Sequence, residues 1–487
     1  MKTLTALFCL CVSALAAPAS VLLPGKSPLV TFRFVFLTGA ASDPADKPGL
    51  ANLTCETLSL SGTRQMTYKQ ILDALFPMAV QTQSYTDKQM MTFTAETHVD
   101  NLEKFYAIFK AMLLEPGWRE EDFRRVKDDQ INALKVSLRG NNDEELGKEE
   151  LYSLIYTGHP FGHENLGTVS SLEKLTLDDV KAFYKAQLTK GTLIIGLAGG
   201  YPADFPARVE KDFSVLTKAV PFQPVLSQIP PIDGNKLTII QKDTRSVAYS
   251  LGFPLDVKRG DADFPALLLV QSYFGQHRES GGRLFQRMRE LRGLNYGDYD
   301  YIEYFPNGMF TFEPSPNLAR KQQIFQIWIR PVEVPTAAFS LKLAMFELDK
   351  LVKNGISEEE FQRTRSFISK QVNLLTKTKS GELGYAIDSA FYGMGDYNAT
   401  IKKALATLTR EQVNAAIRKH LRADNLQIVA VAKDAEGLKA KLLSANPSPM
   451  TYNSPKDQAV MAEDKTVESW DLRIKNVNIV PVDQVFQ

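Results

Sequence analysis

The chain has 487 residues, of which 44% are hydrophobic and 23% are charged, and its formal net charge at pH 7 is +1. A chain of this length has room for two or more hydrophobic cores. The near-zero net charge argues against nucleic acid or an anionic membrane surface as the main partner, because both require a concentrated basic patch.

The first residues have the features of a secretory signal peptide. A positively charged start is followed by the apolar run 4–15 and by the small-residue cleavage signal Ala14-Leu15-Ala16. The run is too short to remain as a membrane anchor. We therefore expect cleavage after Ala16 or Ala17, secretion across the inner membrane and a periplasmic mature chain without a membrane anchor.

Local patterns then predict strands alternating with helices. The alternation in Val30–Leu37 predicts a strand with one buried face, and strand-rich sequence recurs in 80–97 and 193–197. Predicted helices run from Leu50 to Leu60, from Leu102 to Leu113 and from Glu120 towards Arg139. The glycine- and proline-rich segments between them predict loops.

An internal repeat divides the chain into two halves. The segment 175–182 and the strand after it match the later segment 408–415 and its strand without a gap. Each copy reads as a helix, a short turn and a buried strand, which is typical of a duplicated α/β unit. A cluster of prolines at 221–231 predicts the linker, because it cannot continue a helix or a central strand.

These boundaries predict five segments. They are a signal peptide at 1–17, an N-terminal domain at 18–219, a linker at 220–234, a C-terminal domain at 235–446 and a tail at 447–487. We expect the tail to be extended and to pack back on the body.

A family resemblance rests on the segment 47–58, which reads Lys-Pro-Gly-Leu-Ala-Asn-Leu-Thr-Cys-Glu-Thr-Leu, on His159-Pro160-Phe161-Gly162 and on 281–296. These segments resemble the M16 (pitrilysin/insulinase-type) zinc peptidases. The resemblance implies an α+β fold of two homologous LuxS/MPP-like α/β domains, each an antiparallel-rich sheet with helices packed on one face. In active members the helix after Gly-Leu-Ala carries the zinc motif His-x-x-Glu-His.

The zinc motif is degenerate in this chain. The two histidines of the motif fall at Asn52 and Glu56, and its glutamate base falls at Cys55, so each is replaced. The glutamate that serves as third ligand falls at Ala133, or at Asn132 if the register slips by one. The resemblance therefore implies that this chain binds no zinc and has no catalytic residues in the motif.

The second half keeps another part of the family pattern. The resemblance implies that Arg289 and Tyr296 bind substrate and help to stabilise charge on the carbonyl oxygen, since both side chains are hydrogen-bond donors at neutral pH. Some bacterial members divide the zinc motif and the Arg/Tyr pair between two chains. We therefore expect a heterodimer with a zinc-bearing M16 subunit, no activity alone, and a peptide or unfolded protein as substrate, bound partly at a sheet edge.

Three alternatives accompany this interpretation. Cys55 is a small buried hydrophobe or, less in keeping with its surroundings, a nucleophile. His159 and His163 form a relocated metal site or belong to a structural turn, which Pro160 and Gly162 favour. The whole chain is a peptidase subunit or a stand-alone periplasmic peptide-binding or scaffold protein.

Overall fold

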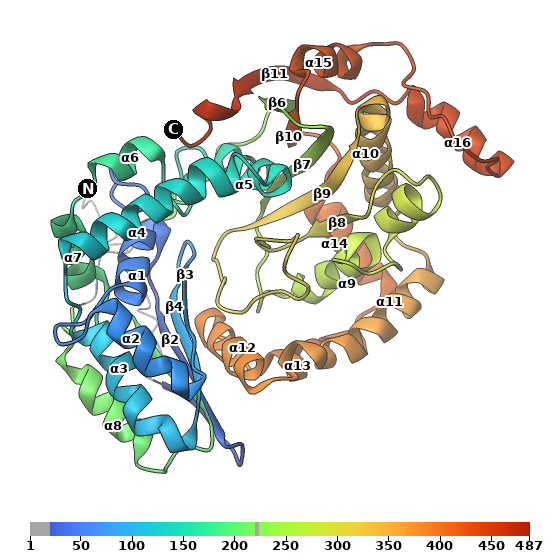
Figure 1. Ribbon diagram of the computed structural model, residues 1–487. Coiled ribbons are helices and arrows are strands. Elements are labelled where there is room, and N and C mark those ends of the chain that lie inside the picture. The colour runs from blue at the N-terminus through green and yellow to red at the C-terminus, as the bar shows by residue number, and fades with distance from the viewer. Residues whose placement is uncertain (1–19, 220–223) are drawn as a thin grey trace, which may run out of the picture.

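The computed structural model describes residues 20–219 and 224–487, and these form two mixed sheets with helices packed around them (Figure 1). The predicted signal peptide at 1–17 lies outside the described residues, as do residues 220–223 of the predicted linker. Within the described ranges, no helix has the length and apolar character needed to cross a membrane.

The first half contains a five-stranded sheet of order β1-β5-β2-β4-β3. Its strands are β1 (Ser20–Pro24), β2 (Leu29–Phe36), β3 (Thr82–Thr86), β4 (Met91–His98) and β5 (Leu193–Gly199). Its helices are α1 (Leu50–Leu60), α2 (Tyr68–Leu75), α3 (Leu102–Leu114), α4 (Glu120–Asn132), the π-helix η4 (Ala133–Leu138), α5 (Asp143–Ile155), α6 (Val169–Lys174), α7 (Leu177–Gln187) and α8 (Phe205–Asp212). All pairings are antiparallel except that of β1 with β5.

The second half contains a six-stranded sheet of order β11-β6-β10-β7-β9-β8. Its strands are β6 (Asn235–Gln241), β7 (Ser246–Leu255), β8 (Asp298–Tyr301), β9 (Gln323–Glu333), β10 (Gln427–Ala432) and β11 (Ile474–Pro481). Its helices are α9 (Phe264–Gly275), the π-helix η6 (Phe285–Glu290), α10 (Ala337–Asn354), α11 (Glu358–Gln371), α12 (Lys379–Tyr392), α13 (Tyr397–Thr407), α14 (Arg410–His420), α15 (Ala435–Leu443) and α16 (Gln458–Glu468). Apart from the added β11, this sheet repeats the topology of the first in chain order.

The sequence repeat corresponds to α7 with β5 and to α14 with β10. Both helices begin at a capping box, in which the N-cap hydroxyl and the third helical side chain each accept a backbone N–H. The pairs are Thr176 with Asp179 and Thr409 with Gln412. The same local signal therefore sets the start of the equivalent helix in each half.

Each half sends one helix across to the sheet of the other half (Figure 1). Helix α5 packs on β7 and β10, and helix α12 packs on β1, β2 and β5. Val35 and Ile194 of the first sheet are buried with Leu383 and Ile387 of α12. The prediction that the first long strand buries one face was wrong for this reason, since seven of the eight residues of β2 are buried.

The prediction of an extended tail was wrong for residues 458–468, which form α16. Beyond this helix, β11 extends the second sheet by pairing in parallel with β6. The end of the chain then returns to the first half, where Val169 and Ser170 donate backbone hydrogen bonds to the carbonyls of Phe486 and Gln487 at 3.0 and 2.8 Å.

The hairpins of the two halves differ in length. In the first half a tight turn joins β3 to β4, and the backbone N–H of Asp87 donates to the carbonyl of Met90 at 2.8 Å. In the second half residues 302–322 join β8 to β9 without a helix or strand, and we call this segment the 302–322 loop. It reaches the first half, where Tyr85 donates its hydroxyl to the carbonyl of Pro316 at 2.7 Å.

Candidate functional site

Backbone geometry fixes the start of α1, which carries the degenerate motif. Asp43 caps this helix by accepting the backbone N–H groups of Gly49 and Ala51, each at 2.7 Å. Gly49 has φ 93° and Gly167 has φ 85°, and a Cβ on either would lie 2.4 Å or less from a carbonyl oxygen of the facing segment. These two glycines therefore allow the loop before Gly167 to approach α1 closely.

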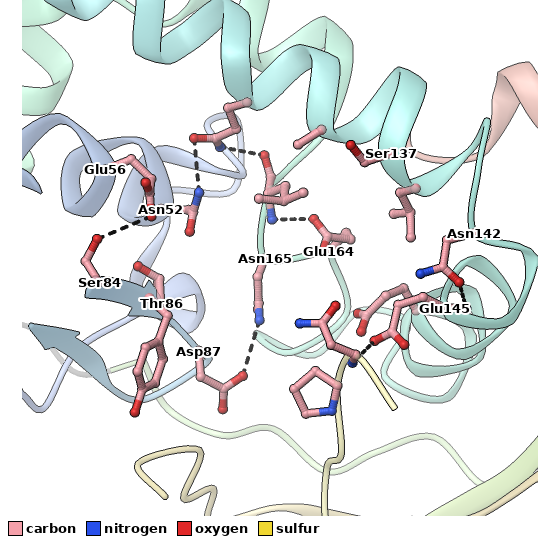
Figure 2. A pocket seen from close by; sticks show the side chains of 18 of the residues that line it. Asn52, Glu56, Ser84, Thr86, Asp87, Ser137, Asn142, Glu145, Glu164 and Asn165 are labelled. Carbon is pink, nitrogen blue, oxygen red and sulfur yellow. Dashed lines mark hydrogen bonds between the residues drawn. The ribbon is translucent and has the colours of Figure 1, made fainter. Parts of the chain in front are cut away.

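A cavity of about 780 Å³ opens beside α1 (Figure 2). Its wall is formed by α1, β3, α4, η4, α5, residues 164–166 and the 302–322 loop. Asn52, Glu56 and Ala133 line it, as their correspondence to metal positions implies, whereas Asn132 does not. The structure thus brings three of the four predicted positions together and favours Ala133 over Asn132 as the equivalent of the third ligand.

Hydrogen bonds occupy the side chain of Asn52. Its Nδ2 donates to Oε1 of Gln130 at 3.1 Å, and Nε2 of Gln130 donates to the carbonyls of Gly49 and Leu166 at 3.1 and 2.8 Å. Ala133 offers only a methyl group at the point where α4 continues as the π-helix η4. Of the four motif positions, only Glu56 therefore presents a group that zinc prefers to the cavity.

Glu56 is a partly buried acid. Burial raises the pKa of its carboxyl to about 7, and a hydrogen bond from the Ser84 hydroxyl at 3.4 Å opposes that rise. Such a carboxyl can gain or lose a proton near neutral pH. Neither Asn52 nor Ala133 can join Glu56 in holding a metal that would activate a water molecule. The arrangement therefore does not support metal-assisted hydrolysis.

Cys55 lies on α1 but does not line the cavity. Its side chain is fully buried, and burial together with the neighbouring Glu56 raises the pKa of the thiol well above its usual range. A thiol held in its neutral form is a poor nucleophile. The geometry therefore agrees with the interpretation of Cys55 as a small buried hydrophobe.

Three carboxylates of the cavity lining, those of Asp87, Glu149 and Glu164, belong to a buried network of charged groups. Arg320 of the second half donates through Nε to Oδ2 of Asp87 at 2.8 Å and makes a second bond to Oδ1 of the same carboxylate. Burial raises the pKa of both Glu149 and Glu164. Burial also lowers the pKa of Lys88, whose ammonium donates to the carbonyl of His163.

The two histidines considered as a metal pair lie in a turn, as Pro160 and Gly162 predict. Nδ1 of His159 accepts the backbone N–H of Phe161 at 3.0 Å, and burial lowers the pKa of its ring to about 4. Nε2 of His163 contacts Oδ2 of Asp43 at 3.2 Å. The rings have separate partners, so this geometry does not favour one metal shared between them.

Arg289 and Tyr296 lie together, away from this cavity. The guanidinium donates to the backbone carbonyl of Tyr296 at 3.0 Å and lies 5.9 Å from its ring centroid and 4.8 Å from that of Phe285. The Tyr296 side chain is 75% exposed. Within the described residues Arg289 makes no ion pair, so the pair presents free donors at the surface.

A second cavity, of about 840 Å³, lies in the second half. Helices α9, α11 and α12 contribute to its wall, and they correspond in chain order to α1, α4 and α5 of the first cavity. Tyr304, Ser315 and Leu318 of the 302–322 loop line both cavities. This loop therefore forms a shared wall between two equivalent positions in the fold.

The sequence interpretation missed several cavity residues. Gln130, Glu145, Glu149 and Glu164 come from two helices and a loop, and no motif links them in sequence. A usable signal is the acidic start of α5, which has Asp143, Glu144 and Glu145 in its first turn. Most of that helix is buried.

Comparison with known protein families finds two matches. Residues 22–169 match the insulinase family, peptidase family M16, and residues 174–367 match the M16 peptidase inactive domain. Among relatives, an uncharacterized zinc protease of Rickettsia bellii is 24% identical over 74% of this chain and 82% of its own length. The non-peptidase homolog YmxG of Helicobacter pylori is 19% identical over 83% of this chain and 89% of its own length.

Solved structures show the same fold. An M16 peptidase inactive domain from Pseudomonas fluorescens superimposes with a TM-score of 0.73 at 22% identity, over 85% of this chain and 94% of that one. The first half of the periplasmic protease PqqL from Escherichia coli gives a TM-score of 0.66 at 12% identity, over 92% of this chain and 94% of that one.

Proposed function

This chain belongs to the M16 peptidase family as an inactive homologue, and from that premise we propose that it is the non-catalytic subunit of an exported zinc metallopeptidase. A partner subunit of the same family supplies the zinc and the general base. This chain completes the chamber and binds the peptide substrate through Arg289 and Tyr296. It binds no zinc itself.

One contrast carries the proposal. Of the three positions that correspond to zinc ligands, Asn52 and Ala133 offer no suitable ligand and Glu56 alone offers a carboxylate, whereas Arg289 and Tyr296 retain free donors on an accessible surface. A guanidinium and a phenol placed near a reacting carbonyl stabilise the charge that develops on its oxygen. Because the pair lies apart from the chain's own cavity, a site in a second subunit is the reaction centre that it can serve.

The edge strand β3 supports peptide binding. It is the last strand of the first sheet, and within the described residues it pairs only with β4. An extended peptide can add to such an edge through main-chain hydrogen bonds. Ser84 and Thr86 of the same strand line the cavity, so a peptide bound here runs along its rim.

The test uses the complex of this chain with a zinc-bearing M16 subunit. Arg289→Ala should lower peptidase kcat about ten- to a hundredfold, as expected for loss of one oxyanion donor, while the zinc content of the complex stays constant. Arg363→Ala, which removes an arginine from the second cavity, is the matched control. Unchanged kinetics in the Arg289 variant would contradict its proposed role in binding the substrate.

Export to the periplasm is part of the proposal. The signal-like start of the sequence supports it, and the structural neighbour from Escherichia coli is described as a periplasmic protease. A stand-alone peptide-binding or scaffold protein is the competing function. Recovery of this chain as a stable monomer or homodimer after co-expression with the zinc subunit favours that alternative.

A further inference from the structure

We propose that the cavity beside the degenerate motif binds the guanidinium or ammonium group of a basic side chain in an extended peptide. The inference rests on the proposed peptide binding along β3, and it names the substrate class that this chain would select. It concerns the position that zinc would occupy in active relatives. There the lost metal charge is replaced by a positive charge carried on the peptide.

The cavity wall carries acidic side chains and no basic ones within the described residues. The acidic side chains that line it are Glu56, Asp87, Asp129, Glu145, Glu149 and Glu164. Among the described residues, no lysine, arginine or histidine lines it. A ligand that enters this cavity therefore meets acceptors, and a cationic donor is the group that matches them.

Within the described residues, only half of these carboxylates form an ion pair. Asp87 is paired with Arg320, Glu145 with Lys148 at 3.3 Å, and Asp129 with Arg125 at 3.6 Å. The other three are Glu56, Glu149 and Glu164, and within the described residues none of them forms an ion pair. Their hydrogen-bond donors are neutral groups, namely the hydroxyls of Ser84 and Tyr304 and a backbone N–H.

Two further polar atoms in the wall have no hydrogen-bond partner among the described residues. Asn165 is 9% exposed, and its Nδ2 donates to Asp87 at 3.2 Å while its Oδ1 accepts no hydrogen bond. Thr86 is 8% exposed, and its hydroxyl is also without a partner. Buried acceptors left without donors are costly. A guanidinium, which carries five donors and accepts none, suits such a wall.

The position of β3 relates the cavity to a peptide. Ser84, Tyr85 and Thr86 all line the cavity from β3, and Ser84 and Thr86, two residues apart, lie on one face of the strand (Figure 2). A peptide that pairs with this edge has its own alternate side chains on the same face. One of them can therefore reach the acidic wall while the main chain stays on the strand.

Binding of a cation in this cavity should also release protons. Burial raises the pKa of Glu56, Glu149 and Glu164, so these carboxyls hold protons near neutral pH. Glu149 also faces Glu145, Arg320, Lys88 and Lys148, and Glu164 faces Glu149 and Lys88. An entering cation favours their charged forms, so its binding should release protons.

The test is isothermal titration calorimetry on the chain without its signal peptide. The probe is an acetylated, amidated heptapeptide of alanine and valine with arginine at its centre, and its counterpart carries citrulline, which has the same shape without the charge. The arginine peptide should bind at least about tenfold more tightly, as expected for buried charge-assisted hydrogen bonds. Its binding enthalpy should depend on the ionisation enthalpy of the buffer.

Two variants assign the selectivity to this cavity. Glu56→Gln keeps the shape of the side chain and should reduce the preference for arginine over citrulline. Glu279→Gln, which changes a partly buried acid of the second cavity, should leave that preference intact. Equal affinities for the two peptides, no binding of either, or equal effects of the two variants would overturn the inference. None of these results bears on the Arg289→Ala experiment, whose readout is the activity of the partner's zinc site.

Discussion

The two cavities occupy equivalent places in the two halves but differ in chemistry. In the part of the chain that the structure describes, the first is lined by carboxylates and amides without a lining cation, whereas Arg259, Arg278, Arg363 and Lys370 line the second. Aromatic rings such as Tyr385 also contribute to the second wall. The duplicated fold therefore supplies the position of a cavity, while the side chains that line it decide what the cavity can bind.

The 302–322 loop is a backbone difference between the halves near these cavities. Where the first half has a tight turn, this loop runs between the cavities and contributes Tyr304, Ser315 and Leu318 to both walls. Its Arg320 is 2% exposed and lies with its guanidinium 3.5 Å from the ring centroid of Tyr304. The loop therefore couples the two otherwise equivalent regions through one buried cation.

Breaking that link should have the largest effect. Arg320→Met leaves the buried carboxylate of Asp87 without its partner, and we expect a loss of about 3–5 kcal/mol in the free energy of unfolding. Urea denaturation followed by circular dichroism measures the change. The double variant Arg320→Met with Asp87→Asn should recover part of the loss. A single variant as stable as the parent would show that the pair does not hold the loop.

The exchanged helices should respond alike, with a smaller effect. Leu383 of α12 and Leu151 of α5 are both fully buried, one against each sheet or its neighbours. Replacing either with alanine should cost about 3 kcal/mol, the middle of the range for such truncations. Thermal unfolding should remain a single transition in both variants. A variant in which one half melts before the other would break the proposed equivalence.

The smallest effect is a change in pH dependence. Burial raises the pKa of Glu56 to about 7, so the folded chain holds this proton in a range where the unfolded chain has lost it. Its contribution to stability is therefore present at pH 4 and is lost as the pH rises towards 8.

As the pH rises from 5 to 8, the free energy of unfolding of Glu56→Gln should therefore increase by on the order of 1–2 kcal/mol relative to that of the parent. Chemical denaturation at both values measures this gain. The exposed Glu120, changed to glutamine, serves as the control. An equal pH dependence of the parent and the Glu56 variant would show that the cavity does not perturb this carboxyl.

Much of the fold was predictable because its signals are local. The helix from Leu50 to Leu60 has the predicted ends, and the repeated Thr-x-x-polar capping boxes mark α7 and α14. The degenerate motif was also legible, since Asn52 and Glu56 lie one helical turn apart and reach the same cavity.

The remaining features depend on contacts between distant segments. Nothing near Val35 in sequence indicates that a helix of the other half covers it, and nothing near Asp87 indicates Arg320 as its partner. The tail shows the same limit, because the pairing of β11 with β6 requires an edge that only the folded second sheet provides. Sequence periodicity reports one face of a strand, not what covers the other.

The exchange of α5 and α12 also bears on how the chain reaches its final structure. The face of the first sheet that contains Val35 and Ile194 stays uncovered until α12 has been synthesised, because its cover comes from the other half. Contacts so distant along the chain slow folding and expose apolar surface in intermediates. A first half produced alone would keep that surface and tend to aggregate. The nascent chain would therefore depend on holding chaperones until its last third has been synthesised.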